Sequence, residues 1–272
     1  MKPILNLDDL PVDVRRALGE VRAIRLLPQG MTSAVALVET DGGPRVLKRA
    51  RGVLYADWLH NEYRALIALA ETDLPIPTPR AFVRVENKIV PESWLAMDYL
   101  AGRPLCDALA DVASSSQRAA LLCAFGETLA RIHATPAPAS IPRPTPSWIE
   151  FMLEEAGENL EHFDVDGTPE LLARVRGQFQ AGQIAPLPPT LIHGDYTLDN
   201  VLVEGERVTG VIDWSGCAIG DRRHDVALAT RPEDGVFEGT QRLTDLEAFF
   251  NGYGAEYDLN ELQFFVDLYE FF

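Results

Sequence analysis

The sequence predicts an α+β protein in which a small antiparallel sheet in the first hundred residues precedes a larger, mainly helical part. Two observations predict this division. Residues 21–50 contain short β-branched or apolar runs separated by the turn sequences PQG and DGG, as in successive antiparallel strands. After residue 115, apolar residues recur at helical spacing instead. We therefore expect one lobe over residues 1–100 and a second over residues 101–272.

The first lobe also carries one helix and two further strands. From Trp58 to Ala70 the apolar residues lie on one helical face, and the segment ends before the proline-broken LPIPTPRAF. Residues 81–100 then indicate two strands, of which ESWLAMDYL is the more apolar. The expected lobe is thus a sheet of five strands with one helix.

The second lobe is expected to consist mostly of helices. A proline-rich connector, ATPAPASIPRPTPS, ends the first of them. Short strands are predicted at 191–193, 201–203 and 208–212, and helices at 115–133, 149–163, about 170–180, 243–250 and 261–272. The two middle helices belong to a segment inserted at about residues 141–189.

The charge balance argues against nucleic acid as a partner. The chain has 272 residues, with 24 basic and 41 acidic side chains and a formal net charge of −17, so the basic surface that phosphate backbones require is missing. No apolar stretch is long enough to cross a bilayer. We expect a cytoplasmic protein, monomeric or homodimeric, that binds neither nucleic acid nor membrane.

The strongest chemical signal is LIHGDYTLDNVLV followed by VTGVIDWSG. It supplies Asp195, Asn200 five residues later, and Asp213 at the end of a separate short strand. Phosphoryl transfer needs a carboxylate to orient the attacking hydroxyl, and hard oxygen ligands for the magnesium that bridges the phosphates. Each residue alone would suit an ordinary loop or cap, but the combination indicates a phosphotransferase.

These motifs resemble the aminoglycoside phosphotransferase family, relatives of protein kinases that also include choline, homoserine and methylthioribose kinases. The resemblance runs from about Val21 to Phe272. It is most specific over HGDYTLDNVLVEGERVTGVIDWSGCAIGDRRHDVALATR, which is similar to kanamycin-type kinases, as is the terminal EFF. It implies a protein-kinase-like two-lobed fold. It also implies Asp195 as the base, Asn200 and Asp213 as magnesium ligands, and Asp225 and His193 as supports of the catalytic loop.

The same resemblance implies that the N-terminal lobe binds ATP or GTP as co-substrate. Lys48, at the end of VLKRA, would hold the α- and β-phosphates, and Glu62 on the following helix would hold the lysine. QGMTSAVALV resembles the short nucleotide loop of the family, and AMDYLAGRPL the segment that contacts the purine through its backbone. The further nucleotide-binding candidates are therefore Met31, Thr32, Ser33, Asp98 and Leu100.

The resemblance further implies that carboxylates from the inserted helices and the C-terminal end hold a cationic acceptor, because ammonium groups that lose water need fixed negative partners. The equally open alternative is a solvated helix face. The candidates lie on the inserted segment and near the C-terminal end: Glu154, Glu155, Glu158, Glu233, Glu270 and the carboxylate of Phe272.

Three positions depart from the kanamycin-type pattern. Gly216 stands where those kinases carry an arginine, Pro232 replaces an acidic residue after ALATR, and Tyr269 replaces the acid before EFF. These departures argue against kanamycin itself as the acceptor.

Three functions follow from the motifs: an antibiotic-resistance kinase, a kinase for a metabolic alcohol such as choline, homoserine or a sugar, and a catalytically idle nucleotide-binding scaffold. The scaffold is disfavoured because Lys48, Asp195, Asn200 and Asp213 are all present. A protein kinase is disfavoured because no activation loop with an APE-like end lies between Asp213 and Asp225.

Overall fold

The structure, a computed structural model, describes residues 5, 7–27, 32–86, 90–233 and 235–272. Its chain forms two compact units. The first comprises Met1–Gly102 and Thr209–Gly216, and the second comprises Arg103–Val208 and Cys217–Phe272. The first unit thus also includes a short segment from late in the sequence, and that segment contains Asp213.

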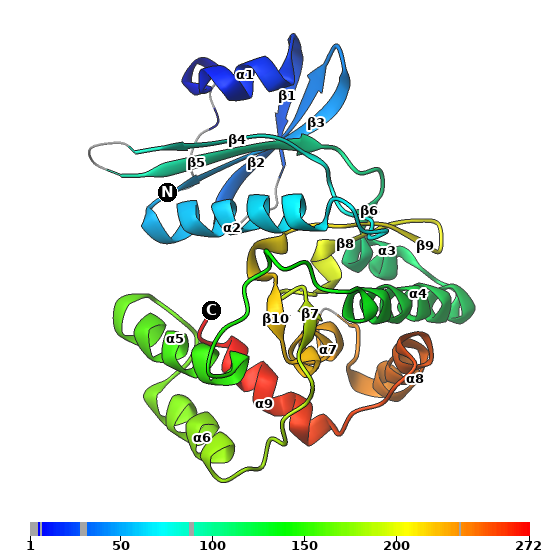
Figure 1. Cartoon of the computed structure of the whole chain (residues 1–272). Coiled ribbons are helices and arrows are strands. Elements are labelled where there is room, and N and C mark those ends of the chain that lie inside the picture. The colour runs from blue at the N-terminus through cyan, green and yellow to red at the C-terminus, as the bar shows by residue number, and fades with distance from the viewer. Residues whose placement is uncertain (1–4, 6, 28–31, 87–89, 234) are drawn as a thin grey trace. The chain divides into compact units, whose positions relative to one another are not determined.

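An antiparallel sheet forms the centre of the first unit (Figure 1). Its strands follow the order β1-β2-β3-β5-β4, and all of their pairings are antiparallel. The strands expected from the sequence are present as β1 (Val21–Leu26), β2 (Ser33–Thr40), β3 (Gly43–Arg51), β4 (Pro79–Val85) and β5 (Glu92–Asp98).

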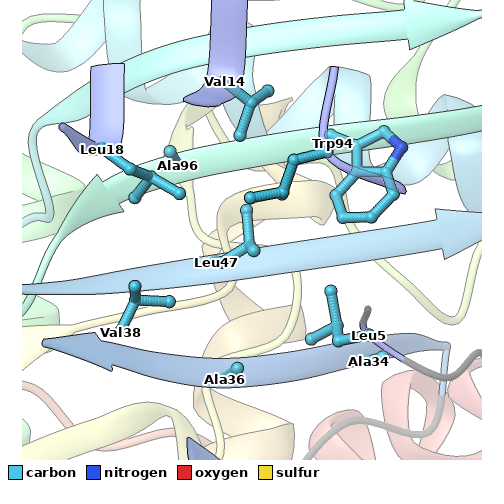
Figure 2. Packing of buried hydrophobic residues seen from close by; sticks show 10 residues of the cluster. Leu5, Val14, Leu18, Ala34, Ala36, Val38, Leu47, Trp94 and Ala96 are labelled. Atoms are coloured by element: carbon cyan, nitrogen blue, oxygen red, sulfur yellow. The ribbon is translucent and has the colours of Figure 1, made fainter. Parts of the chain in front are cut away.

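Helices cover both faces of this sheet. The helix α1 (Val12–Leu18) packs over a buried cluster on one face, where Leu47 and Trp94 point toward it (Figure 2). The helix α2 (Val53–Leu69) packs against β3, β4 and β5. Successive strand residues point to opposite faces, so Leu47 joins the α1 cluster while Lys48 reaches α2. This alternation fixes which strand residue can meet the helix.

Two features of the first unit differ from the sequence-based expectation. The helix α1 was not expected, because it is short and its buried residues, Val14 and Leu18, span only about one turn. The helix α2 begins at Val53, earlier than Trp58. Its first turn carries exposed apolar side chains, Val53 and Tyr55, so the periodic pattern starts later than the backbone helix does.

The second unit is mainly helical. Side-chain oxygens cap several helix N-termini: Ser114 accepts from the Gln117 N–H, Ser147 from Glu150 and Thr168 from Leu171. The helices are α3 (Leu105–Asp111), α4 (Ser115–Ala134), α5 (Trp148–His162), α6 (Pro169–Gln180), α7 (Arg222–Thr230), α8 (Arg242–Tyr253) and α9 (Leu259–Tyr269). Of these, α3 and α7 were not expected from the sequence, α7 because its segment HDVALAT is buried all round.

Two glycines bring α4 and α8 into main-chain contact. A Cβ atom on Gly252 would overlap the carbonyl of Cys123, and one on Gly126 would overlap the carbonyl of Phe249. The Arg118 guanidinium on α4 also donates to both oxygens of Asp245 on α8, at 2.8 and 2.7 Å. The helices α4 and α8 are therefore held together by close main-chain packing and by a charged pair.

Short strands frame the loops that carry the predicted chemistry. β7 (Thr190–Ile192) pairs with β10 (Ala218–Gly220), and β8 (Val201–Glu204) lies between β6 (Arg103–Pro104) and β9 (Arg207–Val211). The loop from β7 to β8 carries Asp195 and Asn200, and Asp213 follows β9. No helix within the described residues combines the length and apolar character needed to span a membrane.

Candidate active site

Lys48 and Glu62 form a buried ion pair in the first unit. The Lys48 Nζ donates to both Glu62 carboxylate oxygens, at 2.7 and 2.8 Å. The lysine comes from β3 and the glutamate from α2. The predicted pair is therefore formed, and Glu62 holds the Lys48 ammonium group in a fixed position.

Asp213 completes this cluster within the same unit. Its Oδ1 lies 3.7 Å from Lys48 Nζ and accepts from the Ser215 hydroxyl at 3.3 Å. Asp213 has a φ of 64°, a left-handed conformation that costs free energy for a residue with a side chain and is common at functional sites. The carboxylate is only partly buried, at 41% exposed, and is thus accessible to a ligand.

Burial and the two carboxylates act in opposite directions on Lys48. Burial lowers the pKa of Lys48, but Asp213 and Glu62 outweigh it, so the pKa lies above its ordinary value. Burial raises the pKa of Glu62 to about 7, against the opposing effect of Lys48. Lys48 therefore stays charged at neutral pH, which its predicted contact with phosphates would require.

The ion pair lines a hollow in the first unit. Thr32 and Ser33, two of the predicted nucleotide-loop residues, lie in its wall, and the third, Met31, falls outside the described residues. The hydroxyl groups of Thr32 and Ser33 can donate hydrogen bonds to phosphate oxygens. The other lining residues are Lys48, Tyr55, Trp58, Leu59, Glu62, Asp213 and Ser215.

The predicted purine-binding segment follows β5. The Asp98 backbone N–H donates to the carbonyl of Thr78 at 2.9 Å, and its carboxylate accepts from Arg80 and pairs with Arg45. Leu100 is half-buried just beyond the strand. The Asp98 N–H is thus engaged within the sheet unit, and purine recognition at this segment stays a prediction.

The catalytic loop in the second unit is fixed by Asp225 on α7. Its carboxylate accepts from the backbone N–H groups of His193, at 2.7 Å, and Gly194, at 2.8 Å, and contacts His133 Nε2 at 3.1 Å. Burial works to raise the pKa of Asp225, but the hydrogen bond and charge of His133 outweigh it and the pKa is lowered. An ionised, fully buried carboxylate therefore anchors the loop backbone.

Gly194 and His193 shape the turn that presents Asp195. Gly194 has a φ of 88°, which a residue with a side chain rarely adopts. The His193 Nδ1 accepts from the Asp195 backbone N–H at 3.2 Å, and the ring is fully buried. His193 thus contacts the backbone of the loop, and its role as a support of catalysis stays a prediction.

His224 is a loop contact that the sequence-based interpretation missed. Its Nε2 donates to the carbonyl of Gly194 at 3.1 Å, next to the two bonds that Asp225 accepts. Its Nδ1 is buried and has no hydrogen-bond partner among the described residues. Burial lowers the pKa of His224. Protonation would put a charge in the interior and an N–H at the buried Nδ1, which has no hydrogen-bond acceptor among the described residues. The adjacent HD pair in the sequence was the available signal.

This histidine predicts a pH dependence of stability. As pH falls through about 6.5, the unfolded chain protonates its histidine before the folded chain does, so the contribution of His224 is present above that pH and lost below it. We expect the free energy of unfolding, measured by urea denaturation, to fall more in the wild type than in His224→Gln between about pH 7.5 and 5.5. His162→Gln, on the exposed end of α5, is the control. Equal losses in wild type and His224→Gln would contradict the assignment.

Asp195 is held at both carboxylate oxygens. The Asn200 Nδ2 donates to Asp195 Oδ2 at 2.8 Å and to the Asp195 carbonyl at 2.9 Å. The Tyr269 hydroxyl donates to Asp195 Oδ1 at 2.7 Å. The first contact joins two residues predicted from the motif, whereas the second brings in a residue 74 positions away. The Asp195 carboxylate is thus held by hydrogen bonds at both oxygens, and its role as the general base stays a prediction.

The donor chemistry of Asn200 and Asp213 fits magnesium. Because the Asn200 amide nitrogen faces Asp195, its oxygen is left as the ligand atom, and Asp213 offers a partly exposed carboxylate. The described residues contain no group of three or more His, Cys, Asp or Glu side chains that could hold a metal alone. Magnesium in phosphotransferases uses one or two protein carboxylates together with substrate phosphates. The oxygens of Asn200 and of Asp213 each suit the ion by their chemistry, and their joint role as its ligands stays a prediction.

The predicted acceptor residues are spread over three parts of the second unit. On α5, Glu154 and Glu158 are exposed and Glu155 is half-buried, and burial followed by the charges of Glu158 and Glu154 raises the pKa of Glu155. Glu233 pairs with Arg231 at 3.6 Å. The Glu270 carbonyl accepts from the Gly167 N–H at 2.7 Å, and Phe272 is exposed.

The chain is similar to known phosphotransferases. A solved aminoglycoside-3'-phosphotransferase of type VIII matches with a TM-score of 0.68 at 22% identity, covering 92% of this chain and 94% of that one. This match confirms the predicted protein-kinase-like α+β fold. Homoserine kinase from Methylobacillus flagellatus is 27% identical over 240 residues, 88% of this chain and 72% of that protein.

A further relative is viomycin phosphotransferase from Streptomyces vinaceus, which is 31% identical over 229 residues, 75% of each chain. The model of the phosphotransferase enzyme family matches residues 23–265. This range contains Lys48, Glu62, Asp195, Asn200 and Asp213. The match extends over most of the chain, and the protein therefore belongs to the phosphotransferase enzyme family.

Proposed function

We propose that this chain is a magnesium-dependent small-molecule kinase that transfers the γ-phosphate of ATP or GTP to a hydroxyl group, with Asp195 as its base. The first unit binds the nucleotide, and the second unit carries the base and the acceptor residues. The observation that carries the proposal is the buried Lys48 ammonium, held by Glu62 at 2.7 and 2.8 Å beside Asp213.

The first unit suits a polyphosphate. Lys48 would bind the α- and β-phosphates while Glu62 keeps the ammonium in place, and the hydroxyls of Thr32 and Ser33 line the same hollow. Asp213, with Asn200, would hold the magnesium. When bound, that ion neutralises charge on the phosphate oxygens during transfer.

In the transfer step one proton moves, one bond forms and one bond breaks. The acceptor hydroxyl gives its proton to Asp195, and its oxygen forms a bond to the γ-phosphorus. The bond between that phosphorus and the β-phosphate bridging oxygen breaks, and the nucleoside diphosphate leaves. Asn200 keeps the carboxylate in place during the step, since its amide donates to Asp195 Oδ2.

Asp213→Asn tests the nucleotide half of this proposal. Asn tolerates the left-handed backbone that position 213 adopts, so the variant removes the charge and keeps the turn. In the wild type, magnesium should strengthen nucleotide binding. We expect this gain in affinity to be at least about 10-fold smaller in the variant, and turnover to fall in parallel. Isothermal titration with ATP and GTP, in magnesium and in EDTA, measures the effect.

The matched control is Asp41→Asn, in the exposed turn between β2 and β3 of the same unit. It removes one carboxylate without touching the hollow and should bind nucleotide as the wild type does. An unchanged magnesium effect in Asp213→Asn would contradict the assignment of this ligand. Absence of saturable binding of either nucleotide to the wild type would overturn the kinase proposal itself.

The acceptor is proposed to be a small hydroxylated molecule, with an aminoglycoside-like cation as the first candidate. The acidic face of α5 supports a cation, because crowding and burial raise the pKa of Glu155 and an ammonium partner would relieve that repulsion. The similarity to homoserine kinase from Methylobacillus flagellatus over 88% of this chain supports a small amino alcohol as the alternative. A cytoplasmic location, where both nucleotides are available, and a monomeric or homodimeric state stay predictions.

A thermal-shift panel distinguishes these acceptors. Aminoglycosides, viomycin, macrolides, choline, homoserine and simple sugars would be added with and without magnesium nucleotide. A ligand that binds only the folded chain raises Tm, and the stabilisation grows with the logarithm of 1 plus its concentration divided by its Kd. We expect a cationic acceptor to shift wild type more than a Glu154→Gln, Glu155→Gln, Glu158→Gln triple variant, and a neutral acceptor to shift both equally.

A further inference from the structure

The hydroxyl of Tyr269 occupies a specific position on the Asp195 carboxylate. It donates to Asp195 Oδ1 at 2.7 Å, within the 2.6 to 3.2 Å over which a general base takes a proton from a hydroxyl. The opposite oxygen, Oδ2, accepts from Asn200. A hydroxyl from the protein thus contacts the carboxylate in the way that an acceptor hydroxyl would have to.

The aromatic ring of Tyr269 is fixed by neighbours from another helix. The Arg231 guanidinium lies 5.4 Å from the ring centre, within the range of a cation–π contact. The His224 ring lies 6.1 Å away in a tilted orientation, and its Nε2 binds the catalytic loop at Gly194. Arg231 follows the C-terminal end of α7, and His224 belongs to that helix. The tyrosine and the loop that carries Asp195 therefore both contact His224 of α7.

We propose that Tyr269 is a positioning residue that acts through Asp195: its hydroxyl occupies the carboxylate and keeps water from using it as a base until the acceptor hydroxyl replaces the phenol. The inference rests on the proposed function, since it takes Asp195 as the base. A kinase faces water as a competing acceptor at every turnover. To reach the carboxylate, water must first displace the phenol hydroxyl. This displacement costs free energy, because a hydrogen bond to a charged group is stronger than one between neutral groups.

The test uses hydrolysis of magnesium ATP by the full chain without any added acceptor. Water then attacks the γ-phosphorus, gives its proton to Asp195, and releases ADP and inorganic phosphate. Tyr269→Phe keeps the ring and removes only the hydroxyl. We expect the hydrolysis rate to rise at least about 5-fold, because a hydrogen bond to a charged group no longer has to be displaced, and the Kd of ADP to stay unchanged.

A rise in rate separates this role from a structural one, because damage to the fold lowers the rate. Tyr63→Phe is the matched control. It removes a phenol hydroxyl from α2, where the Tyr63 ring stacks on Phe82, and it should leave hydrolysis unchanged. The gain must also disappear in the double variant Tyr269→Phe, Asp195→Asn, which tests whether the effect passes through the carboxylate.

The outcomes distinguish the inference from the proposed function. Hydrolysis by Tyr269→Phe that is unchanged or slower than wild type overturns the role of Tyr269, whatever the behaviour of Asp195. A gain that persists in the double variant overturns it as well, because the effect would not act through Asp195. The assignment of Asp195 itself fails only if Asp195→Asn transfers phosphate to a true acceptor at the wild-type rate.

Discussion

Asp195→Asn should reduce the rate of phosphoryl transfer by about 10²–10⁴-fold, the usual contribution of a positioned general base. Nucleotide affinity should stay close to that of the wild type, because Asp195 contacts Asn200 and Tyr269 in the second unit, whereas the proposed phosphate ligands belong to the first. Loss of a group that acts in the transition state lowers the rate without weakening ground-state binding. Single-turnover rates and nucleotide Kd values, measured side by side, provide the test.

The substitution is conservative enough to leave the loop in place. The amide oxygen of an Asn at position 195 can accept from Asn200 Nδ2, and its nitrogen can donate to the Tyr269 hydroxyl, which can also accept. The anchoring bonds from His193 and Gly194 to Asp225 are untouched. A variant that loses nucleotide binding but transfers normally once bound would identify Asp195 as a binding residue and reject the mechanism.

Gly252→Ala should lower the free energy of unfolding by about 3 kcal/mol, at the upper end of what overpacking costs. The added methyl group would overlap the carbonyl of Cys123 and lie 2.7 Å from its carbon. The atoms in the way belong to the main chain of α4, so no rotamer change relieves the clash and the two helices must separate. Urea denaturation and thermal melts followed by circular dichroism measure the loss.

Gly177→Ala is the control because it makes the same substitution on the exposed face of α6, where a Cβ would meet nothing within 4 Å. Replacing a glycine inside a helix without a clash stabilises by about 0.5–1 kcal/mol. The two variants should therefore differ in sign. Equal effects would show that α4 and α8 are not in main-chain contact at Gly252.

The sequence predicts the parts of this protein that are local or carried by a motif. The strand that carries Lys48, the helix that carries Glu62 and the loop with Asp195 and Asn200 all follow from short-range patterns. The fold class and the family followed from the same motifs and are confirmed. Their assigned roles stay predictions.

The sequence does not predict contacts that depend on tertiary packing. The sequence marks Tyr269 only as a departure from the acid before EFF, and only the folded chain brings its hydroxyl 2.7 Å from Asp195. His224 was overlooked for a similar reason, because its contact is to a backbone carbonyl rather than to another motif residue. The short helix α1 has too few turns to show periodicity.

The bonds that Asp225 accepts from the catalytic loop have a practical consequence for engineering. They involve the backbone N–H groups of His193 and Gly194, so they fix the path of the loop independently of the surface that meets the acceptor. Glu154 and Glu158 are exposed on α5, a different helix. Libraries that randomise this face while leaving 193–195 and 225 intact should yield folded, active variants with altered acceptor range.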